Sequence, residues 1–230
     1  MYTKKHSKIN FPQGSRLVNF NVEKYNFSTI LQTWFNWRKN LQQLHLQQEY
    51  ITPFSREKDQ STLWHTIFYK KIREDINFLF LYYDFLKTYI KPLYKDTIIF
   101  QTIPCLRIHL PKNVAVGEFH KDKDYRDKEW AEKVVEKNYF LPLTKTNKHN
   151  TIWVESVENK QDYRPILIDP GMCLEWDGSN LSHGNKQNIS NSTRVSLDFR
   201  VIDFNNYIES NKGSINTNTK FKIGEYYSIL

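Results

Sequence analysis

The sequence predicts a mainly β protein with helices, in which a sandwich or barrel of the jelly-roll type packs against N-terminal helices. Two observations indicate this fold class. Before Pro92, apolar residues recur at three- and four-residue steps, which is the period of an amphipathic helix. After Pro92, the pattern changes to a two-residue alternation in short segments separated by turn residues, which is typical of an antiparallel sandwich or barrel.

Three helices are expected in the first part of the chain. The first begins at Ser28, a residue type that caps helices, and carries its apolar stripe as far as Leu44. The second covers residues 61–72. The third covers residues 74–91 with a stripe of aromatic and leucine side chains, and it ends at Pro92 because proline cannot continue a helix. Such stripes are typical of a core, so these helices need a surface to pack on.

Short strands account for most of the remaining chain. The expected strands are residues 16–22, 97–110, 116–120, 138–143, 151–155, 164–168, 172–176 and 194–203. Turn-rich segments such as Asp169-Pro170-Gly171 separate them. Residues 123–137 interrupt this rhythm, because they are charged and helix-prone, and we expect them to form an excursion between two strands. Residues 210–219 are rich in Asn, Ser and Thr and are expected to be mobile.

A single domain is expected for all 230 residues, because a chain of this length buries one substantial core. Its expected parts are a mostly helical support (residues 1–95), a jelly-roll core that carries the functional site (96–205) and a C-terminal tail (206–230). A hydrophobic content of 39% with 15% aromatics is typical of a globular protein and excludes a disordered one. The sequence leaves the oligomeric state open.

Cysteine usage and hydropathy indicate a cytoplasmic protein without a membrane segment. The two cysteines, Cys105 and Cys173, argue against a disulfide framework and suit a reducing compartment. No apolar run follows the first residues, as an export signal would require. The densest apolar run, residues 76–83, is too short to span a bilayer.

The net charge of +8 raises the question of a nucleic-acid partner, which depends on how the charge is distributed. Lys and Arg outnumber Asp and Glu by 15 to 8 in residues 1–100, but only by 18 to 17 in residues 101–230. The excess is dispersed among aromatic and amide side chains and forms no basic arm. We therefore interpret it as a solvated surface, and a nucleic-acid partner is not expected.

Two histidines and one aspartate form the candidate functional site. His120 and Asp122 stand two residues apart, so on an extended strand they would point to the same face. His183 follows a glycine-containing turn and would supply a third side chain. Two neutral imidazoles and one carboxylate leave three octahedral positions open, which is the arrangement of non-haem Fe(II) sites that bind a co-substrate and O2. A structural zinc site would close a tetrahedron instead, and no Cys-x-x-Cys or His-x-x-x-His motif is present.

A regular alternation of polar and apolar side chains begins eleven residues after His183. Arg194, Ser196, Asp198 and Arg200 share one face of this segment, and the residues between them are all apolar. If the apolar face packs in the core, the polar face lines a lumen, where buried charge is costly unless a partner satisfies it. A fixed guanidinium with a neighbouring hydroxyl would suit the distal carboxylate of 2-oxoglutarate.

Three motifs in the second half of the chain belong together. They are His120-Lys121-Asp122, Leu181-Ser182-His183-Gly184-Asn185 and Arg194-Val195-Ser196-Leu197-Asp198-Phe199-Arg200. Jointly they resemble the Fe(II)/2-oxoglutarate-dependent dioxygenases, and more narrowly a bacterial branch that includes a streptomycin-biosynthesis protein and is distantly similar to the phytanoyl-CoA hydroxylases. Asp124-Tyr125, residues 138–144 and residues 150–156 match further pieces of that branch, so the resemblance extends over about residues 100–205.

The resemblance implies a double-stranded β-helix, a cupin-like jelly roll, that binds Fe(II), 2-oxoglutarate as a co-substrate, and O2. The implied roles are catalytic iron ligand for His120, Asp122 and His183, 2-oxoglutarate anchor for Arg194, and co-substrate contact for Ser196 and Asn138. Family members that halogenate lack the carboxylate that Asp122 provides. Hydroxylation or a related oxidation is therefore implied.

The activity that the resemblance implies is hydroxylation of an unactivated C–H bond in a small polar metabolite, with release of succinate and CO2. A sugar derivative, an amino acid or a natural-product intermediate would be such a substrate. Candidate substrate contacts are Arg107, Trp153, Glu155 and Tyr125. A Trp on a sandwich strand is more often a core residue, which is the alternative interpretation of Trp153. The segment that contains residues 123–137 is longer than is usual in this branch, which makes it a candidate lid.

The sequence leaves two alternative functions open. Arg194 and Arg200 form an Arg-x5-Arg pattern similar to that of the alkylated-base demethylases of the same superfamily, and a pI of about 9.2 would suit nucleic acid. Against this, the near-neutral charge of residues 101–230 provides no track for phosphates beside the site. The other alternative is a non-catalytic jelly-roll module that binds a carbohydrate or a partner protein. Such a module would form no succinate and would be indifferent to a His120→Ala substitution.

Overall fold

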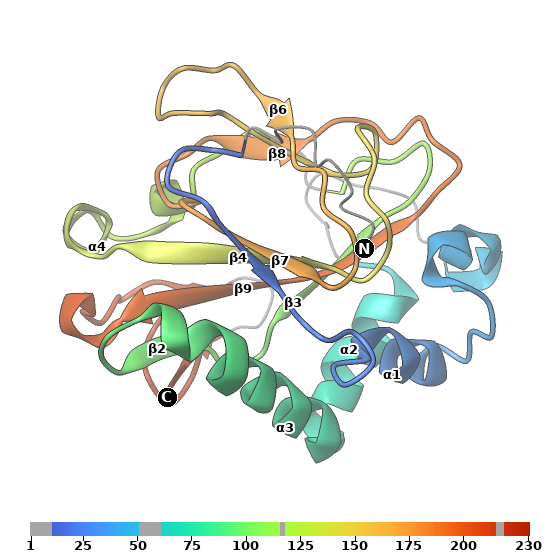
Figure 1. Cartoon of the computed structure of the whole chain (residues 1–230), viewed down its shortest axis with the longest axis horizontal. Coiled ribbons are helices and arrows are strands. Elements are labelled where there is room, and N and C mark those ends of the chain that lie inside the picture. The colour runs from blue at the N-terminus through green and yellow to red at the C-terminus, as the bar shows by residue number, and fades with distance from the viewer. Residues whose placement is uncertain (1–10, 51–60, 116–117, 215–218) are drawn as a thin grey trace, which may run out of the picture.

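The computed structural model describes residues 11–50, 61–115, 118–214 and 219–230 (Figure 1). In this part of the chain, a three-stranded sheet packs against one face of a seven-stranded sheet, and helices cover the other face. The predicted fold class, mainly β-structure with N-terminal helices, is confirmed. Within the described ranges, none of the helices has the length and apolar character needed to cross a bilayer.

The larger sheet has the strand order β1-β7-β4-β9-β2-β12, and β3 pairs with β9 as well. Its strands are β1 Arg16–Asn19, β2 Ile98–Gln101, β3 Cys105–His109, β4 Glu136–Pro142, β7 Met172–Trp176, β9 Arg194–Asp203 and β12 Tyr227–Ile229. The smaller sheet has the order β6-β5-β8, with β5 Ile152–Val154, β6 Arg164–Pro165 and β8 His183–Asn185. A separate hairpin joins β10 Gly213–Ser214 to β11 Thr219–Lys220. All these strand pairs are antiparallel.

Strand β9 contributes side chains to both faces of the larger sheet, the face covered by the helices and the face toward the smaller sheet. Its apolar side chains belong to the core under the helices, and these are Val195, Leu197, Phe199 and Val201. Its polar side chains alternate with them and face the smaller sheet, because successive residues of a strand point to opposite faces. A second core lies between the two sheets, where Phe140 and Leu174 of the larger sheet meet Ile152 and Val154 of the smaller one. The predicted strand at residues 194–203 and the predicted alternation in residues 194–201 are thus confirmed.

The prediction of one strand over residues 97–110 is wrong, because the segment forms two strands that both pair with β9. Phe100 pairs with Val201 and Cys105 with Asp198, so five steps along this segment match only three along β9. The extra residues form a bulge that contains Pro104, which has no N–H to donate to a ladder. The bulge allows β2 and β3 to follow the same edge of β9 at different angles to the sheet.

Other predicted strands are present but shorter, and one is reduced to a single bridge. In the segment 116–120, residues 116–117 lie outside the described part of the chain, and His120 alone pairs, with His183. The segment 164–168 pairs only at Arg164–Pro165. Strand β4 begins at Glu136, so the end of the predicted excursion belongs to the sheet.

The four described α-helices are α1 Phe27–Trp34, α2 Leu63–Glu74, α3 Ile76–Phe85 and α4 Lys128–Lys133. The predicted cap at Ser28 is wrong, because Asn26 caps α1 and its Oδ1 accepts the Thr29 N–H at 3.1 Å. Helix α1 is also shorter than predicted, and its apolar stripe continues in a 3-10 helix at Leu41–Leu46. Helix α3 continues as a π-helical turn at Leu86–Ile90. Helix α4 lies in the predicted excursion.

The C-terminal segment is more than a tail. Strand β12 pairs with β2 at the edge of the larger sheet. In the segment predicted to be mobile, residues 215–218 lie outside the described chain, whereas Ser210 is buried and its hydroxyl donates to Asp127 at 2.6 Å. The C-terminus therefore contributes to the sheet that carries the cavity described below.

The helices are fixed to the sheet by aromatic side chains. Phe85 of α3 is fully buried, and its ring lies 5.1 Å from Phe20, 5.5 Å from Tyr25 and 6.3 Å from Phe199 of β9. All three ring pairs meet edge to face, a geometry that aromatic quadrupoles favour. Phe85 therefore connects the helical layer to strand β9 of the larger sheet.

Replacement of Phe85 by Ala is expected to lower the free energy of unfolding by about 3–5 kcal/mol, because it leaves a cavity among packed rings. Phe80 lies on the same helix but is 62% exposed, so Phe80→Ala should change stability by no more than about 0.5 kcal/mol. Urea denaturation of both variants measures the difference. Equal losses would show that α3 is not docked through Phe85.

Candidate active site

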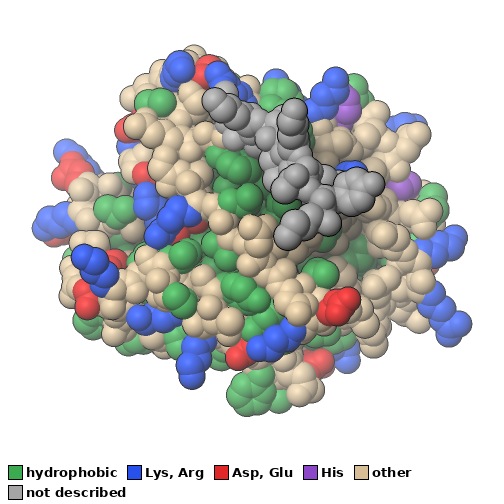
Figure 2. All heavy atoms as spheres, in the orientation of Figure 1, with side chains coloured by type: hydrophobic (Ala, Val, Ile, Leu, Met, Phe, Trp, Pro, Cys, Tyr) green, Lys and Arg blue, Asp and Glu red, His purple; other side chains and the backbone are tan. Residues whose placement is uncertain are grey.

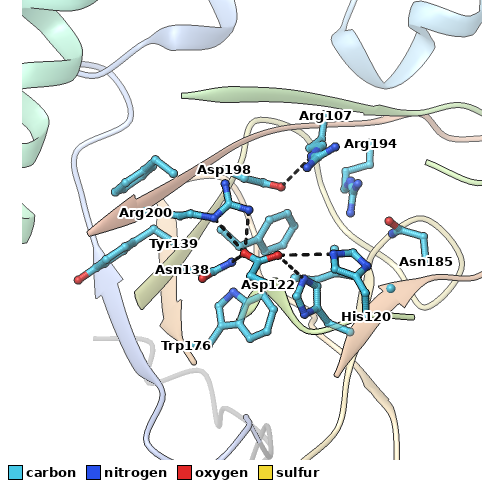
Figure 3. A pocket seen from close by; sticks show the side chains of 15 residues that line it. Arg107, His120, Asp122, Asn138, Tyr139, Trp176, Asn185, Arg194, Asp198 and Arg200 are labelled. Atoms are coloured by element: carbon cyan, nitrogen blue, oxygen red, sulfur yellow. Dashed lines mark hydrogen bonds and ion pairs between the residues drawn. The ribbon is translucent and has the colours of Figure 1, made fainter. Parts of the chain in front are cut away.

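A cavity between the two sheets contains most of the predicted site residues (Figure 3). It encloses about 560 Å³, part of which is open to solvent. Its lining consists of Arg107, His120, Asp122, Asn138, Tyr139, Phe140, Ile152, Trp176, His183, Gly184, Asn185, Arg194, Asp198, Phe199 and Arg200. Tyr139 and Phe199 belong mainly to the core under the helices and reach the cavity only at its floor. The lumen that strand parity predicted for the polar face of β9 is therefore present.

A backbone bridge brings the two histidines together. The His120 N–H donates to the His183 carbonyl and the His183 N–H to the His120 carbonyl, both at 2.9 Å. Directly opposed residues of an antiparallel pair project to the same face, so the two imidazole rings lie 4.5 Å apart. Asp122 follows at the start of a 3-10 turn, and its N–H donates to the Gly178 carbonyl at 3.0 Å. The three side chains thus converge from two segments far apart in the sequence.

Hydrogen bonds to the backbone set the orientation of both rings. Nδ1 of His120 lies 2.9 Å from the Glu118 carbonyl, and Nδ1 of His183 lies 2.9 Å from the Leu181 carbonyl. Because a carbonyl oxygen only accepts, each Nδ1 carries the proton and each Nε2 keeps a lone pair. The Nε2 atoms lie 3.5 and 3.8 Å from Oδ1 of Asp122. These three atoms, all within 4.8 Å of one another, form a set of ligands that fits a divalent cation.

The second carboxylate oxygen of Asp122 is held by the protein. Its Oδ2 accepts from Arg200 Nε at 2.9 Å, Arg200 Nη2 at 2.7 Å and Asn138 Nδ2 at 2.8 Å. Three donors fix Oδ2, so Oδ1 is turned toward the imidazoles. Gly178 makes room for this contact, since a Cβ there would lie 2.5 Å from the Asn138 amide carbon.

Arg200 is itself fixed by buried groups. Its Nη1 donates to the hydroxyl of Tyr226 at 2.9 Å, and its Nε lies 3.6 Å from Glu136 Oε2. Glu136 is fully buried and also accepts from Arg126 Nη2 at 3.1 Å and from the Tyr227 hydroxyl at 2.5 Å. A continuous network therefore runs from Asp122 to the C-terminal tyrosines.

Burial and charge act differently on the three candidate ligands. Burial lowers the pKa of His183 to about 4, so this ring is neutral at pH 7. Burial acts on His120 in the same direction, but the hydrogen bond and charge of Asp122 outweigh it and raise the pKa of His120. Burial alone would raise the pKa of Asp122, yet the Arg200 guanidinium overcomes this and holds it well below its usual range. The carboxylate is therefore ionised.

Arg194 is a buried cation that lines the cavity. The residue is 1% exposed, and its Nε and Nη1 have no hydrogen-bond partner among the residues that the structure describes. Its guanidinium lies 5.6 Å from the centre of the Phe140 ring. Burial lowers the pKa of Arg194 to about 10, so the group still carries its charge at pH 7. A buried guanidinium in this state needs an anion, and its fork fits a carboxylate.

Of the other predicted co-substrate and substrate contacts, Arg107 lines the cavity and Ser196 does not. Arg107 of β3 forms an ion pair with Asp198, with Nε and Oδ2 3.4 Å apart. Ser196 lies on the polar face of β9 and donates to Asp198 Oδ1 at 3.2 Å, but it is absent from the cavity lining. Asn138 lines the cavity and is engaged with Asp122.

Trp153, Glu155 and Tyr125 do not line the cavity, so the structure does not support them as direct substrate contacts. The Trp153 indole donates to the Lys148 carbonyl at 3.1 Å, on the side of β5 that faces away from Ile152 and the cavity. Tyr125 is 57% exposed, with its ring 5.3 Å from that of His120.

Glu155 has a structural role instead, which its position in the sequence did not indicate. The residue is fully buried, and its Oε1 accepts the Ser182 N–H at 2.7 Å. Its Oε2 accepts the Gln161 N–H at 3.0 Å. Although burial alone would raise the pKa of Glu155, these backbone hydrogen bonds outweigh it and lower that pKa. Glu155 therefore holds the segment that leads into His183.

Among the lining residues that the sequence did not single out as site residues, Arg200 and Trp176 contact the His-Asp-His cluster directly. Strand parity placed Arg200 on the lumen side, but its partner Asp122 lies 78 residues earlier, so only the folded sheet reveals the contact. Trp176 ends β7, and its ring meets the His183 ring at 4.6 Å in an edge-to-face arrangement. The alternation within the predicted strand 172–176 indicated on which face Trp176 lies. It did not indicate that this face lies against His183, because that depends on which strands become neighbours.

Two antiparallel sheets that enclose a His-Asp-His cluster opposite a buried arginine define the class of protein, a non-haem metal enzyme of the oxygenase type. The chain is 33% identical over 187 residues to the streptomycin biosynthesis protein StrG of Streptomyces griseus, and the match covers 76% of this chain and 80% of that protein. The chain therefore belongs to the family of Fe(II)/2-oxoglutarate-dependent dioxygenases, in the branch of StrG, as its motifs predicted.

Other comparisons give partial overlaps. No family model matches the chain. AviO1 from Streptomyces viridochromogenes Tue57 superposes with a TM-score of 0.47, at 12% identity over 85% of this chain and 92% of that chain. The apo form of EctD from S. alaskensis superposes with a TM-score of 0.46, at 13% identity over 85% of this chain and 75% of that chain.

Replacement of Glu155 by Ala is expected to lower the free energy of unfolding by about 2 kcal/mol or more, because two backbone N–H groups lose a charged acceptor. The matched control is Glu158→Ala, since Glu158 lies in the same loop, is 41% exposed and pairs with Lys121 and Lys123. Exposed pairs contribute little, so the control should lose less than about 1 kcal/mol. Urea denaturation followed by Trp fluorescence distinguishes the two, and a control that loses as much as Glu155→Ala would contradict the assigned role.

Proposed function

We propose that this chain is an Fe(II)- and 2-oxoglutarate-dependent oxygenase that hydroxylates an unactivated C–H bond of a small polar metabolite, with release of succinate and CO2. One observation carries the proposal. The same cavity holds three converging atoms that could ligate a metal, from His120, Asp122 and His183, and a buried guanidinium, that of Arg194, whose Nε and Nη1 find no hydrogen-bond partner among the described residues. The first set fits a divalent cation and the second fits a carboxylate, so the cavity is suited to a metal and a dicarboxylate together.

We propose that the fold is a double-stranded β-helix of the jelly-roll type, which would suit this function. A large and a small antiparallel sheet face each other, and the cavity lies between them. We assign residues 1–230 to one domain, in which residues 1–95 are helical support, 96–205 form the core with the iron site, and 206–230 close the edge of the sheet through β12.

His120 and His183 would hold the iron through Nε2, and Asp122 through Oδ1. When bound, the iron supplies the chemistry that activates O2 and oxidises the C–H bond. The protein would orient the three ligand atoms before the iron binds. The carbonyls of Glu118 and Leu181 fix the two imidazole rings. Arg200 keeps the Asp122 carboxylate ionised and oriented. Three protein ligands leave room for the co-substrate and O2.

Arg194 would anchor the distal carboxylate of 2-oxoglutarate. Its burial removes the competing water, which strengthens a guanidinium–carboxylate pair. The Phe140 ring against it limits where the guanidinium can move. Ser196, two residues after Arg194 on β9, stays a predicted contact of the co-substrate. The contact of Asn138 with Asp122 favours a role in positioning the metal ligand over the predicted contact with the co-substrate.

The substrate side of the proposal rests on the polarity of the cavity. Charged side chains line it, among them Arg107, Asp198 and Arg200. On the face shown in Figure 2, the Lys and Arg side chains do not form the continuous track that a nucleic-acid backbone would need. Residues 123–137, with α4, lie beside His120 and Asp122 in the chain, and we retain them as the candidate lid.

The direct test is aerobic incubation with Fe(II), ascorbate and 2-oxoglutarate, in which succinate is measured with and without a panel of polar metabolites. We expect slow succinate formation that one class of metabolite accelerates. A His183→Ala variant should lose iron binding and succinate formation, whereas His149→Ala, a histidine outside the cavity lining, should keep both. Failure of the wild-type protein to bind iron, or unchanged iron binding by His183→Ala, would refute the site.

Two arginine variants should separate the metal from the co-substrate. Arg194→Ala is expected to keep the metal and to weaken 2-oxoglutarate binding by about 100-fold, because it removes a charged hydrogen-bonding partner from a buried carboxylate. Arg200→Gln is expected to lower the affinity for the metal by about 10- to 100-fold, because it removes the guanidinium donors that orient Asp122.

Titration of each variant with Mn(II), and then of the Mn(II) form with 2-oxoglutarate, measures both affinities separately. Each variant serves as the control for the other. If Arg194→Ala lost the metal, or Arg200→Gln kept it at wild-type affinity, the division of roles between the two arginines would be wrong.

A further inference from the structure

Two guanidinium groups lie next to each other on the wall of the cavity, and the proposed co-substrate accounts for only one of them. On the paired strands β3 and β9, Arg107 stands opposite Ser196 and His109 opposite Arg194, so Arg107 and Arg194 are diagonal neighbours on one face. Figure 3 shows both side chains on the same side of the cavity, across from the imidazoles. Arg194 is assigned to 2-oxoglutarate, which leaves Arg107 to be explained.

Asp198, the partner of Arg107, is more accessible than Asp122, the partner of Arg200. The side chains of Arg107 and Arg200 are equally exposed, at 16%, but that of Asp198 is 30% exposed and that of Asp122 only 6%. The Arg107–Asp198 ion pair is also longer, 3.4 Å against 2.7 Å between Arg200 and Asp122. The carboxylate of Asp198 is shared with the Ser196 hydroxyl. The Arg107–Asp198 pair thus faces cavity space that a substrate can enter.

The charge of the cavity indicates what that substrate carries. Among the fifteen lining residues, three are arginines and two are aspartates, and the two histidines are neutral when they ligate a metal. The lining therefore has a net charge of +1, and Fe(II) with the 2-oxoglutarate dianion leaves it unchanged. The loaded site lacks one negative charge.

We infer that the substrate of this enzyme is an anion, and that Arg107, positioned by Asp198, binds its carboxylate or phosphate group beside the iron site. A guanidinium binds either group through parallel N–H donors, and a partly desolvated setting strengthens the contact. A neutral sugar or amine would leave the excess charge of the loaded cavity unmatched, and a cation would add to it. The inference rests on the proposed function and narrows it from small polar metabolites to acids.

The test compares each acid with its neutral counterpart. The probes are amino acids against their amides, uronic acids against the parent sugars, and sugar phosphates against the free sugars, so that carboxylate and phosphate recognition are scored separately. Two readouts are used: acceleration of 2-oxoglutarate consumption, and the rise in unfolding midpoint of the anaerobic Fe(II)–2-oxoglutarate form, which reports binding without turnover.

We expect the wild-type protein to prefer at least one acid over its neutral counterpart by about 10-fold or more, which is the effect of one charged contact in a partly buried site. Arg107→Gln should reduce this preference to about twofold or less, and Arg107→Lys, which keeps the charge but not the fork, should retain part of it. The matched control is Arg164→Gln, a half-exposed arginine paired with Asp162, which should keep the full preference.

The outcomes separate this inference from the proposed function. Wild-type protein that consumes 2-oxoglutarate but shows no preference for any acid in either readout overturns the inference and leaves the function standing. An Arg107→Gln variant that loses 2-oxoglutarate binding while keeping the acid preference also overturns it, because Arg107 would then serve the co-substrate. Absence of 2-oxoglutarate consumption under all conditions refutes the function, and the unfolding-midpoint readout still decides whether acids bind through Arg107.

Discussion

The site depends on the pair of backbone hydrogen bonds between His120 and His183. The two residues lie far apart in the chain, and without these bonds nothing would oblige their imidazoles to share a face. The bridge also positions Asp122, which follows His120 by two residues. Glu155 stabilises the bridge, because its carboxylate accepts the N–H of Ser182, the residue before His183. Backbone pairing, rather than contacts between the side chains themselves, therefore creates the triangle of ligand atoms.

A second constraint runs outward from Asp122 through buried charge. Arg200 satisfies Asp122, Glu136 faces Arg200 and Arg126, and the hydroxyls of Tyr226 and Tyr227 complete the network. Each charge in such a network is tolerable only while its partners are present, because a lone buried ion is strongly destabilising. Tyr226 and Tyr227, near the end of the chain and outside the cavity lining, thus help to orient Asp122, the proposed metal ligand.

Most of the candidate site could be predicted from the sequence, because each of its parts is a short pattern of residues. The His120-x-Asp122 spacing, the alternation in β9 and the lone His183 in a glycine-containing turn need no knowledge of the fold. The clamp of Arg200 on Asp122 and the support from Glu155 could not be predicted, because both depend on which strands become neighbours. The same limit explains the strand error at residues 97–110: alternation continues through Pro104, while the register against β9 shifts there.

Strand β9 is a wall shared by two compartments, with the helix-facing core on one side and the cavity on the other. Its side chains alternate between these compartments, so Arg194 has Val195 as its neighbour, and Phe199 precedes Arg200. A single-residue insertion or deletion in this strand would exchange the two faces beyond it, turning charges into the core and apolar groups into the lumen. We therefore expect related sequences to differ in this strand by substitutions and not by insertions or deletions. Changes of chain length, by which such enzymes can reshape a pocket, must occur in the connections around it.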